Sequence, residues 1–481
     1  MSRNIIFYIT LMGFFGLLLS LAIQGGSAVE AEKYVSGQIA IQGNEQQLFS
    51  EFSHNLQHPI SILLLQILCI ILTVRLFSWL AVKIRQPSVI GEIIAGIVLG
   101  PSLLGLIFPD VSTFLFPESS LPNLQFLSQI GLVLFMFIVG MELDISVLMK
   151  KIPNAVVISH ASIVFPCLLG AGIAYFLYPS YAPDNIPFTG FALFMGIAMS
   201  ITAFPVLARI IQERNMGKSS LGAMILVCAA ADDVTAWCLL AVVIAIVKAG
   251  SIAEALITLV FLACYIMLMW YVIKPLLHRF SHRYFTRETM NKTSVTAIFV
   301  VLLMSAYMTE IIGVHALFGA FLAGIIMPAD PRFRQVFAGK IEDLSLVLLL
   351  PLFFAFTGLR TQIGLLNELG QWMVCLAIIA VAVVGKFFGS AIAAKFVGHS
   401  WRDSLIIGAL MNTRGLMELV VLNIGYDLGI LSVEIFSMMV LMALVTTFMT
   451  SPAMDIIDYC HRKLKNVDNL AIGKKMLQQI R

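Results

Sequence analysis

The sequence predicts an all-α polytopic membrane protein, and three observations carry that prediction. Of its 481 residues, 59% are hydrophobic and 12% are charged, about half the charged share of soluble domains. Apolar runs long enough to cross the roughly 30 Å hydrocarbon core of a bilayer recur along the chain. The basic residues gather at alternate ends of these runs. The chain is therefore not a soluble globular protein, and a net charge of +3 gives no sign of a nucleic-acid partner.

The N-terminal residues 1–28 have the pattern of a secretory signal peptide. Arg3 precedes an apolar stretch over residues 5–23, and residues 25–28 are small, as at a cleavage site. The apolar stretch is also long enough to remain as an uncleaved N-terminal helix. Both alternatives leave residues 29–57 as an extracytoplasmic segment.

Thirteen transmembrane helices are predicted within a single membrane domain, residues 58–453. They cover residues 59–80, 88–106, 124–142, 154–177, 188–211, 219–247, 252–274, 293–311, 314–328, 341–359, 371–395, 402–425 and 431–453. If the first of these helices starts outside, 23 basic residues lie on the cytoplasmic side and 3 on the outer side. The positive-inside rule predicts such a split for this number of spans. We expect the protein to lie in the cell, or inner, membrane. A short cytoplasmic tail, residues 454–481, is expected to follow.

Two stretches of the membrane domain repeat each other. Residues 91–101 and 319–328 both contain G-x-x-x-A-G-I followed by a proline, and residues 135–140 and 353–358 follow them in step. The copies lie seven spans apart, so equivalent helices run in opposite directions. This predicts two inverted five-helix repeats, spans 2–6 and 9–13, as in secondary transporters with midplane substrate sites. The alternative is that these glycines only allow close helix packing.

Ionisable residues within the spans are the first functional candidates, because placing one there costs roughly 2.5–3.5 kcal/mol. Asp232 and Asp233 lie near the middle of the sixth span. On a helix they point about 100° apart, so one can face a cavity while the other faces a neighbouring helix. Lys386, in the eleventh span, is the candidate partner for a buried carboxylate. The alternative is a purely structural ion pair.

Two spans are interrupted at corresponding positions of the repeat. The fifth contains Ser200, Thr202 and Pro205, and we expect Pro205 to break the helix and free carbonyl groups. The twelfth contains Arg414 and Glu418 around a glycine. Irregular backbone at this depth lines cavities, and its carbonyls are ready ligands for cations.

Seven motifs in order resemble the second monovalent cation/proton antiporter family. They most resemble the membrane domains of plant-type cation/proton exchangers and of the bacterial NapA and Kef proteins. The motifs cover residues 100–105, 134–144, 200–209, 232–237, 315–324, 350–360 and 411–423. Together they place the match over about residues 58–453.

The resemblance implies a fold similar to NapA and NhaA, in which a core domain moves against a dimerisation domain of a homodimer. Asp233 matches the ion-binding aspartate of the family, and Asp232 matches a position that Asp, Asn or Gln occupies. Lys386 matches the lysine opposite this pair. Residues 200–205 and 412–418 match two crossed, discontinuous helices.

The expected function is therefore secondary active antiport of Na⁺ or K⁺ against H⁺ by alternating access, in pH homeostasis. Asp233 and Asp232 would hold the transported cation with Thr202 and Ser200. The charge-compensating and structural roles would fall to Lys386, Pro205, Arg414 and Glu418. No cofactor and no enzymatic activity are expected. The alternatives are a channel-like K⁺ efflux system, disfavoured because no soluble gating domain is expected after residue 453, and a membrane sensor. An intramembrane aspartyl protease is disfavoured because its two aspartates come from different helices.

The sequence leaves the choice between Na⁺ and K⁺ open, together with the stoichiometry and the direction of transport. If the Asp232–Lys386 pair opens when the cation binds, two protons exchange for one cation. If it stays closed, exchange is electroneutral. We expect the first, because two carboxylates screen a cation better than one.

Overall fold

The computed structural model describes residues 58–479 except 85, 143–151, 215, 217–218, 249–251, 285–291 and 329–330, together with positions 13, 14, 17, 20, 21, 55 and 56. The chain divides into two units, Met1–Ile62 and Leu63–Arg481. The first unit lies largely outside the described residues. The signal peptide at 1–28 and the segment 29–57 therefore stay predictions.

The described residues form helices, and no strand occurs among them. In chain order the helices from α3 onward are α3 (Pro59–Lys83), α4 (Ser88–Leu99), α5 (Leu104–Ile107), α6 (Pro109–Leu115), η1 (Glu118–Ser120), α7 (Leu121–Glu142), α9 (Ile152–Tyr181), α10 (Phe188–Ala198), α11 (Phe204–Glu213), α12 (Ser220–Lys248), α13 (Ile252–Leu268), η2 (Met269–Ile273), α14 (Lys274–Tyr284), α15 (Lys292–Ile312), α16 (Ala316–Ile325), α17 (Pro331–Leu344), η3 (Ser345–Leu349), α18 (Leu350–Arg360), η4 (Ile363–Leu365), α19 (Leu369–Val383), η5 (Val384–Phe388), α20 (Gly389–Phe396), α21 (Trp401–Met411), α22 (Leu416–Asp427) and α23 (Val433–Gln479).

Ten helical segments of the described chain are long and apolar enough to cross a membrane. The protein is therefore an all-helical, multi-pass membrane protein. Of the thirteen predicted spans, 188–211 falls on the short helices α10 and α11, and 402–425 falls on α21 and α22. The span at 314–328 falls on α16, which has ten residues. The count of thirteen crossings stays a prediction.

A first bundle consists of α3 to α7 and α15 to α18, in which α7 packs on α16 and α18 packs on α4. Glycines allow these helices to touch through their backbones. A Cβ at Gly96 would collide with the backbone of Ala355 on α18, and Gly358 lies against Gly96. In the other pair, Gly140 of α7 lies against Gly324 of α16.

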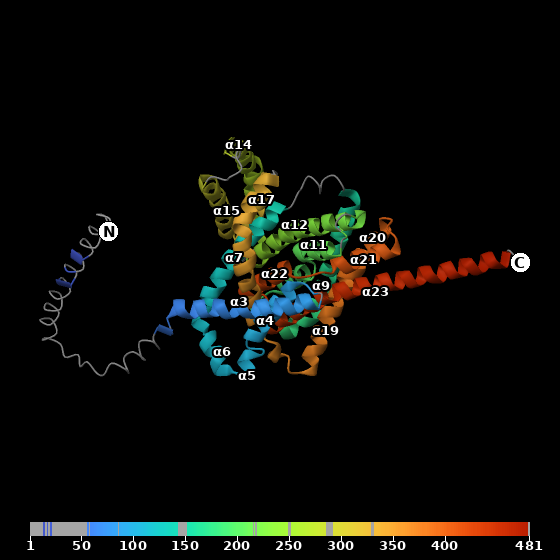
Figure 1. Ribbon diagram of the computed structural model, residues 1–481, viewed down its shortest axis with the longest axis horizontal. Helices are drawn as coiled ribbons and strands as arrows, with labels where there is room; N and C mark the ends of the chain where they lie inside the picture. Colours follow the sequence, from blue (N-terminus) through green and yellow to red (C-terminus); the bar gives the residue numbers. More distant parts are fainter. Residues whose placement is uncertain are drawn as a thin grey trace, which may run out of the picture. The chain divides into compact units, whose positions relative to one another are not determined.

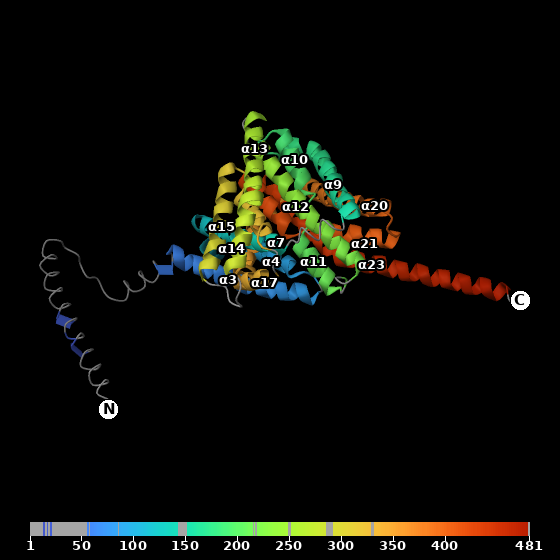
Figure 2. The same ribbon diagram turned by 90° about the horizontal axis from the view of Figure 1, so that it is seen from above.

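A second bundle consists of α9 to α12 and α19 to α23, in which α9 packs on α10, α12 and α20, and α23 packs on α19, α21 and α22. In Figures 1 and 2, α15 and α17 of the first bundle lie on one side, and α20 and α21 of the second lie on the other. Gly385 and Gly389 allow η5 and α20 to pack closely on α9, because a Cβ at either glycine would meet Pro166 or Phe165 of α9. Helices α13 and η2, followed by α14, connect the bundles.

The last helix is longer than the sequence predicts. The thirteenth span was expected to end at residue 453, but α23 continues through Pro452 to Gln479. A proline inside a helix leaves the carbonyl four residues earlier without its usual donor. Here the amide Nε2 of Gln86 donates to that carbonyl, on Phe448, over 3.5 Å. The tail therefore begins as a continuation of a membrane helix.

Candidate functional site

The site is built where two broken helices cross inside the second bundle. Helix α10 ends at Ala198 and α11 begins at Phe204, while α21 ends at Met411 and α22 begins at Leu416. The two connections touch, because the N–H of Ala203 donates to the carbonyl oxygen of Thr413 at 3.0 Å. Four helix ends, whose terminal N–H or C=O groups have no partner within their own helix, thus meet beside the middle of α12.

The prediction that Pro205 breaks the fifth span is wrong in one respect. Pro205 is the second residue of α11, and the break precedes it, over residues 199–203. In the first turn of a helix a missing N–H costs no intrahelical hydrogen bond, and the fixed φ angle of proline favours the helical start. Pro205 therefore begins the second half-helix.

Asp232, on α12, accepts hydrogen bonds from four side chains. Its Oδ1 accepts from the Ser159 hydroxyl at 2.6 Å. Its Oδ2 accepts from the hydroxyls of Ser162 at 3.0 Å and Thr202 at 2.7 Å, and from the ammonium of Lys386 at 3.0 Å. All five residues are fully buried. The carboxylate is therefore compensated by one cation and three hydroxyl dipoles.

Lys386 lies in the π-helical turn η5, and its ammonium has three acceptors. Besides Asp232, it donates to the carbonyl oxygen of Ser162 at 3.0 Å and to that of Ser200. The Ser162 carbonyl is free because Pro166, four residues later inside α9, has no N–H to offer it. An ammonium group has three N–H donors, so the buried charge of Lys386 is fully hydrogen-bonded.

Asp233 has a different environment from its neighbour. Its side chain is 1% exposed, and no described side chain donates a hydrogen bond to either carboxylate oxygen; the group it meets is the backbone of Phe204, the first residue of α11. It lines a small pocket together with Ile201, Trp237, Met417 and Val421. An ionised carboxylate in such a place costs several kcal/mol of desolvation, roughly, unless a cation or a proton neutralises it.

Arg414 is also fully buried, and it binds the C-terminal end of α10. Its guanidinium donates to the carbonyl oxygens of Ala198 at 3.2 Å and Met199 at 2.6 Å, and to Oε1 of Glu418 at 3.1 Å. The carbonyl end of a helix carries partial negative charge. Arg414 and Lys386 therefore donate to the three successive carbonyl groups of residues 198–200, where α10 ends.

The predicted ligands Thr202 and Ser200 lie in this region, but their hydroxyls have other acceptors in this structure. The Thr202 hydroxyl binds Asp232 and approaches the carbonyl oxygen of Met411 at 3.3 Å. The Ser200 hydroxyl donates back to the carbonyl oxygen of Gly196 at 2.6 Å. Their roles at the ion site stay predictions, as do those of the other predicted site residues.

The contribution of α9 is not among the features predicted from the sequence. Ser159, Ser162 and Pro166 follow one another at intervals of three and four residues, so they share one face of a helix. Two serines and a proline on one face of an otherwise apolar span are the signal that could have found them. That face holds Asp232 and Lys386 in place.

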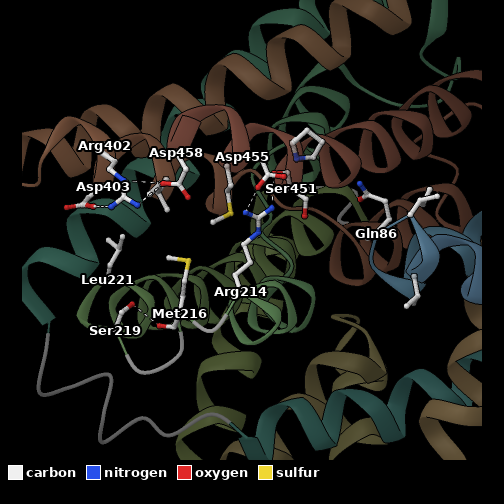
Figure 3. A pocket seen from close by; sticks show the side chains of 15 residues that line it. Gln86, Arg214, Met216, Ser219, Leu221, Arg402, Asp403, Ser451, Asp455 and Asp458 are labelled. Atoms are coloured by element: carbon white, nitrogen blue, oxygen red, sulfur yellow. Dashed lines mark hydrogen bonds and ion pairs between the residues drawn. The ribbon is translucent and has the colours of Figure 1, made fainter. Parts of the chain in front are cut away.

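A cavity of about 960 Å³ opens at the end of the second bundle where α11 ends and α21 begins. Figure 3 shows Arg214 beside Asp455 and Ser451, and Arg402 beside Asp403 and Asp458. Arg214 Nη1 lies 2.7 Å from Asp455 Oδ1, and Arg402 Nη2 lies 2.7 Å from Asp458 Oδ1. Both ion pairs attach α23 to the ends of the broken helices.

A family model described as "Sodium/hydrogen exchanger, transmembrane" matches residues 68–455. Among curated proteins, the chain is 42% identical to the Na(+)/H(+) antiporter NhaS4 of Synechocystis over 81% of this chain and 96% of that protein. It is 39% identical to the Cation/H(+) antiporter 17 of Arabidopsis thaliana over 82% of this chain and 48% of that protein. It is 35% identical to the K(+)/H(+) antiporter 1 of Saccharomyces cerevisiae over 84% of this chain and 47% of that protein. The chain thus spans about half the length of these plant and yeast relatives.

Among solved structures, the sodium proton antiporter MjNhaP1 of Methanocaldococcus jannaschii at pH 8 is similar in fold. The TM-score is 0.62 at 15% sequence identity, and the match covers 81% of this chain and 96% of that chain. At this identity the likeness concerns the fold alone.

Proposed function

The chain belongs to the sodium/hydrogen exchanger family of monovalent cation/proton antiporters, and we propose that it exchanges Na⁺ or K⁺ for H⁺ across a membrane by alternating access. The observation that carries this proposal is the contrast between two adjacent carboxylates. Asp232 is hydrogen-bonded by four side chains, whereas Asp233 is buried and receives no hydrogen bond from any described side chain. An ionised Asp233 in that position needs a cation or a proton that can bind and dissociate.

Asp233 is the group on which the two substrates compete. Its carboxylate is neutralised by either a proton or a cation, and both remove the cost of keeping a lone negative charge in a dry pocket. A neutralised site crosses the barrier between the two membrane faces more easily than a charged one. Movement is then coupled to binding of one substrate or the other, and this coupling is antiport.

Lys386 supplies a second proton in this scheme. When the cation arrives, Asp232 keeps three hydroxyl donors, from Ser159, Ser162 and Thr202. The carboxylate can therefore stay ionised after Lys386 has lost its proton and moved away. One proton leaves Asp233 and one leaves Lys386 for each cation, so net charge crosses the membrane. The membrane potential then contributes about 2.3 kcal/mol per charge per 100 mV.

We propose further that the chain crosses the membrane thirteen times with an inverted repeat. The glycine contacts support the repeat. The sequence match equates Gly96 with Gly324 and Gly140 with Gly358, and these residues pair across helices as Gly96 with Gly358 and as Gly324 with Gly140. An equivalence that exchanges α4 with α16 and α7 with α18 therefore maps one contact onto the other.

We place the Arg214 end of the bundles in the cytoplasm and the Arg360 end outside. The excess of basic residues near Arg214, Arg402 and the tail supports this orientation. The protein would lie in the inner or cell membrane with a cytoplasmic C-terminus. The homodimer stays a prediction, which cross-linking in intact membranes can check.

Exchange in proteoliposomes tests the proposed function. Purified protein is reconstituted with a pH-sensitive dye inside, and Na⁺, K⁺ or choline is added outside. An alkali cation should move protons and choline should not, and the concentration dependence of each cation gives the selectivity. Equal proton movement with choline would reject antiport. Cation flux that carries no protons would favour the channel-like alternative.

A further inference from the structure

Alternating access requires a route to Asp233 from each membrane face, and the pockets beside the interface of the two bundles differ in size at the two ends. At the Arg214 end, a cavity of about 610 Å³ lies between α3, α4 and α18 of the first bundle and reaches Val206 on α11 of the second. At the Arg360 end, the pocket between α7, α18 and α22 has only about 20 Å³. Helices α7 and α18 line both pockets. Phe135 and Phe354 line the larger one, and Leu132 and Phe353 line the smaller one. The space beside the interface of the two bundles is therefore larger at the Arg214 end than at the Arg360 end.

Hydrogen bonds link the two bundles at the Arg360 end. Nη1 of Arg360, the last residue of α18, lies 2.7 Å from Oδ1 of Asp427, the last residue of α22. The same nitrogen donates to Oδ1 of Asn423 at 3.1 Å. From α7, the amide Nε2 of Gln125 donates to Oδ2 of Asp427 at 3.2 Å. The amide Nδ2 of Asn423 in turn donates to the hydroxyl of Thr357 on α18 at 2.8 Å.

The pair is better sheltered than an ordinary surface ion pair. The Arg360 side chain is 16% exposed and that of Asp427 is 32% exposed. The guanidinium also lies over the rings of Phe356 on α18 and Tyr426 on α22, with its carbon 4.3 Å and 5.2 Å from the ring centroids. One cation thus contacts a carboxylate, an amide and two aromatic faces contributed by both bundles.

We propose that Arg360 and Asp427 form a latch that holds the outer end of the path shut while the cytoplasmic end is open. The inference rests on the proposed alternating access. When the bundles move so that the outer end opens, α18 and α22 separate there, and the latch must break. The two residues are positioning residues, because they set the balance between the two states without contacting the exchanged ions.

Thiol labelling from each side of the membrane tests the latch. Starting from a variant in which the seven native cysteines are replaced, one cysteine is introduced at Val420, which lines the 20 Å³ pocket, or at Val89, which lines the 610 Å³ cavity. An impermeant thiol reagent is added to vesicles of known orientation. Asp427→Asn should speed outer labelling at position 420 about fivefold or more, the scale of a sheltered ion pair. It should slow cytoplasmic labelling at position 89, because the two states exclude each other.

The reciprocal change separates a latch from local loosening. If outer labelling at position 420 rises while labelling at position 89 stays constant, the pair is only a local contact and the proposal is wrong. Unchanged labelling at both positions would also overturn it. Arg360→Gln should reproduce the result of Asp427→Asn, which guards against a defect of one variant.

A matched control comes from the pair at the other end. Arg214 and Asp455 are also 2.7 Å apart, but α11 and α23 both belong to the second bundle. Asp455→Asn should therefore change labelling at neither position, and a reciprocal shift in this variant would contradict the proposal. Labelling does not require exchange. If the latch variants shift labelling but wild-type protein moves no protons, the proposed function fails and the two-state latch does not.

Discussion

Asp232 and Asp233 are neighbours on one helix, yet Asp232 accepts hydrogen bonds from three hydroxyls and a lysine and Asp233 accepts none from any described side chain. The arrangement divides two tasks between two identical side chains. Asp232 holds the crossing of the broken helices and Lys386 together. Asp233 remains the group whose charge depends on what enters its pocket.

Removing the hydroxyl of Thr202 should weaken cation binding. In Thr202→Ala, Asp232 loses a 2.7 Å hydrogen bond that also ties the α10–α11 connection to α12. Since a hydrogen bond to a charged group contributes roughly 1.5–3 kcal/mol, the apparent cation affinity should fall about tenfold, with a smaller effect on the maximal rate. Thr202→Ser keeps the hydroxyl and should behave like the wild type. An unchanged apparent affinity in Thr202→Ala would remove this residue from the site.

Pro166→Ala should impair exchange without touching any ionisable group. The new N–H of residue 166 would donate to the carbonyl oxygen of Ser162, as in a regular α-helix. Lys386 would then lose one of its three acceptors. We expect an exchange rate about tenfold lower. Pro179→Ala lies in the same helix and should leave the rate unchanged. If both variants behave alike, the freed carbonyl has no part in holding Lys386.

Arg414 and Glu418 should show the energetics of a buried pair. Arg414→Met leaves Glu418 without its cation and the end of α10 without its cap, so stability should fall by roughly 3–5 kcal/mol. The double variant Arg414→Met/Glu418→Leu removes the stranded charge and should recover part of that loss. Melting temperatures of the purified variants check this. A double variant as unstable as the sum of the two single variants would contradict it.

Much of the fold can be predicted from the sequence, because membrane helices follow from apolar runs of sufficient length. The site is only partly predictable. The pairing of Lys386 with an aspartate follows from the cost of burying either charge alone, and Arg414 and Glu418 lie one helical turn apart.

The rest depends on tertiary packing that no local pattern expresses. Arg360 and Asp427 are 67 residues apart and meet only because α18 and α22 end at the same face. The role of Pro166 requires knowing that α9 faces η5. The sequence predicts a helix break at Pro205 because a proline inside a long apolar run usually marks a kink. In the structure Pro205 is instead the second residue of a new helix.

Lys386→Gln should reduce the voltage dependence of exchange. Glutamine keeps donors for the carbonyl oxygen of Ser162 and for Asp232 but carries no charge. If Lys386 supplies the second proton, the wild type moves net charge in each cycle, and the variant exchanges one proton for one cation. Proteoliposomes with an imposed potassium diffusion potential measure this for Na⁺ transport. A wild type that ignores the potential would eliminate the two-proton scheme.

The most direct test of Asp233 as the exchanging group is cation-driven proton movement in proteoliposomes containing Asp233→Asn. Asparagine has nearly the same shape as aspartate but has no carboxyl group that can be charged or protonated, so we expect no exchange above that of protein-free vesicles. Asp455→Asn, which changes a surface carboxylate, should exchange like the wild type. Wild-type rates in Asp233→Asn, at equal amounts of folded protein, would contradict the assignment of Asp233 as the group that exchanges proton and cation.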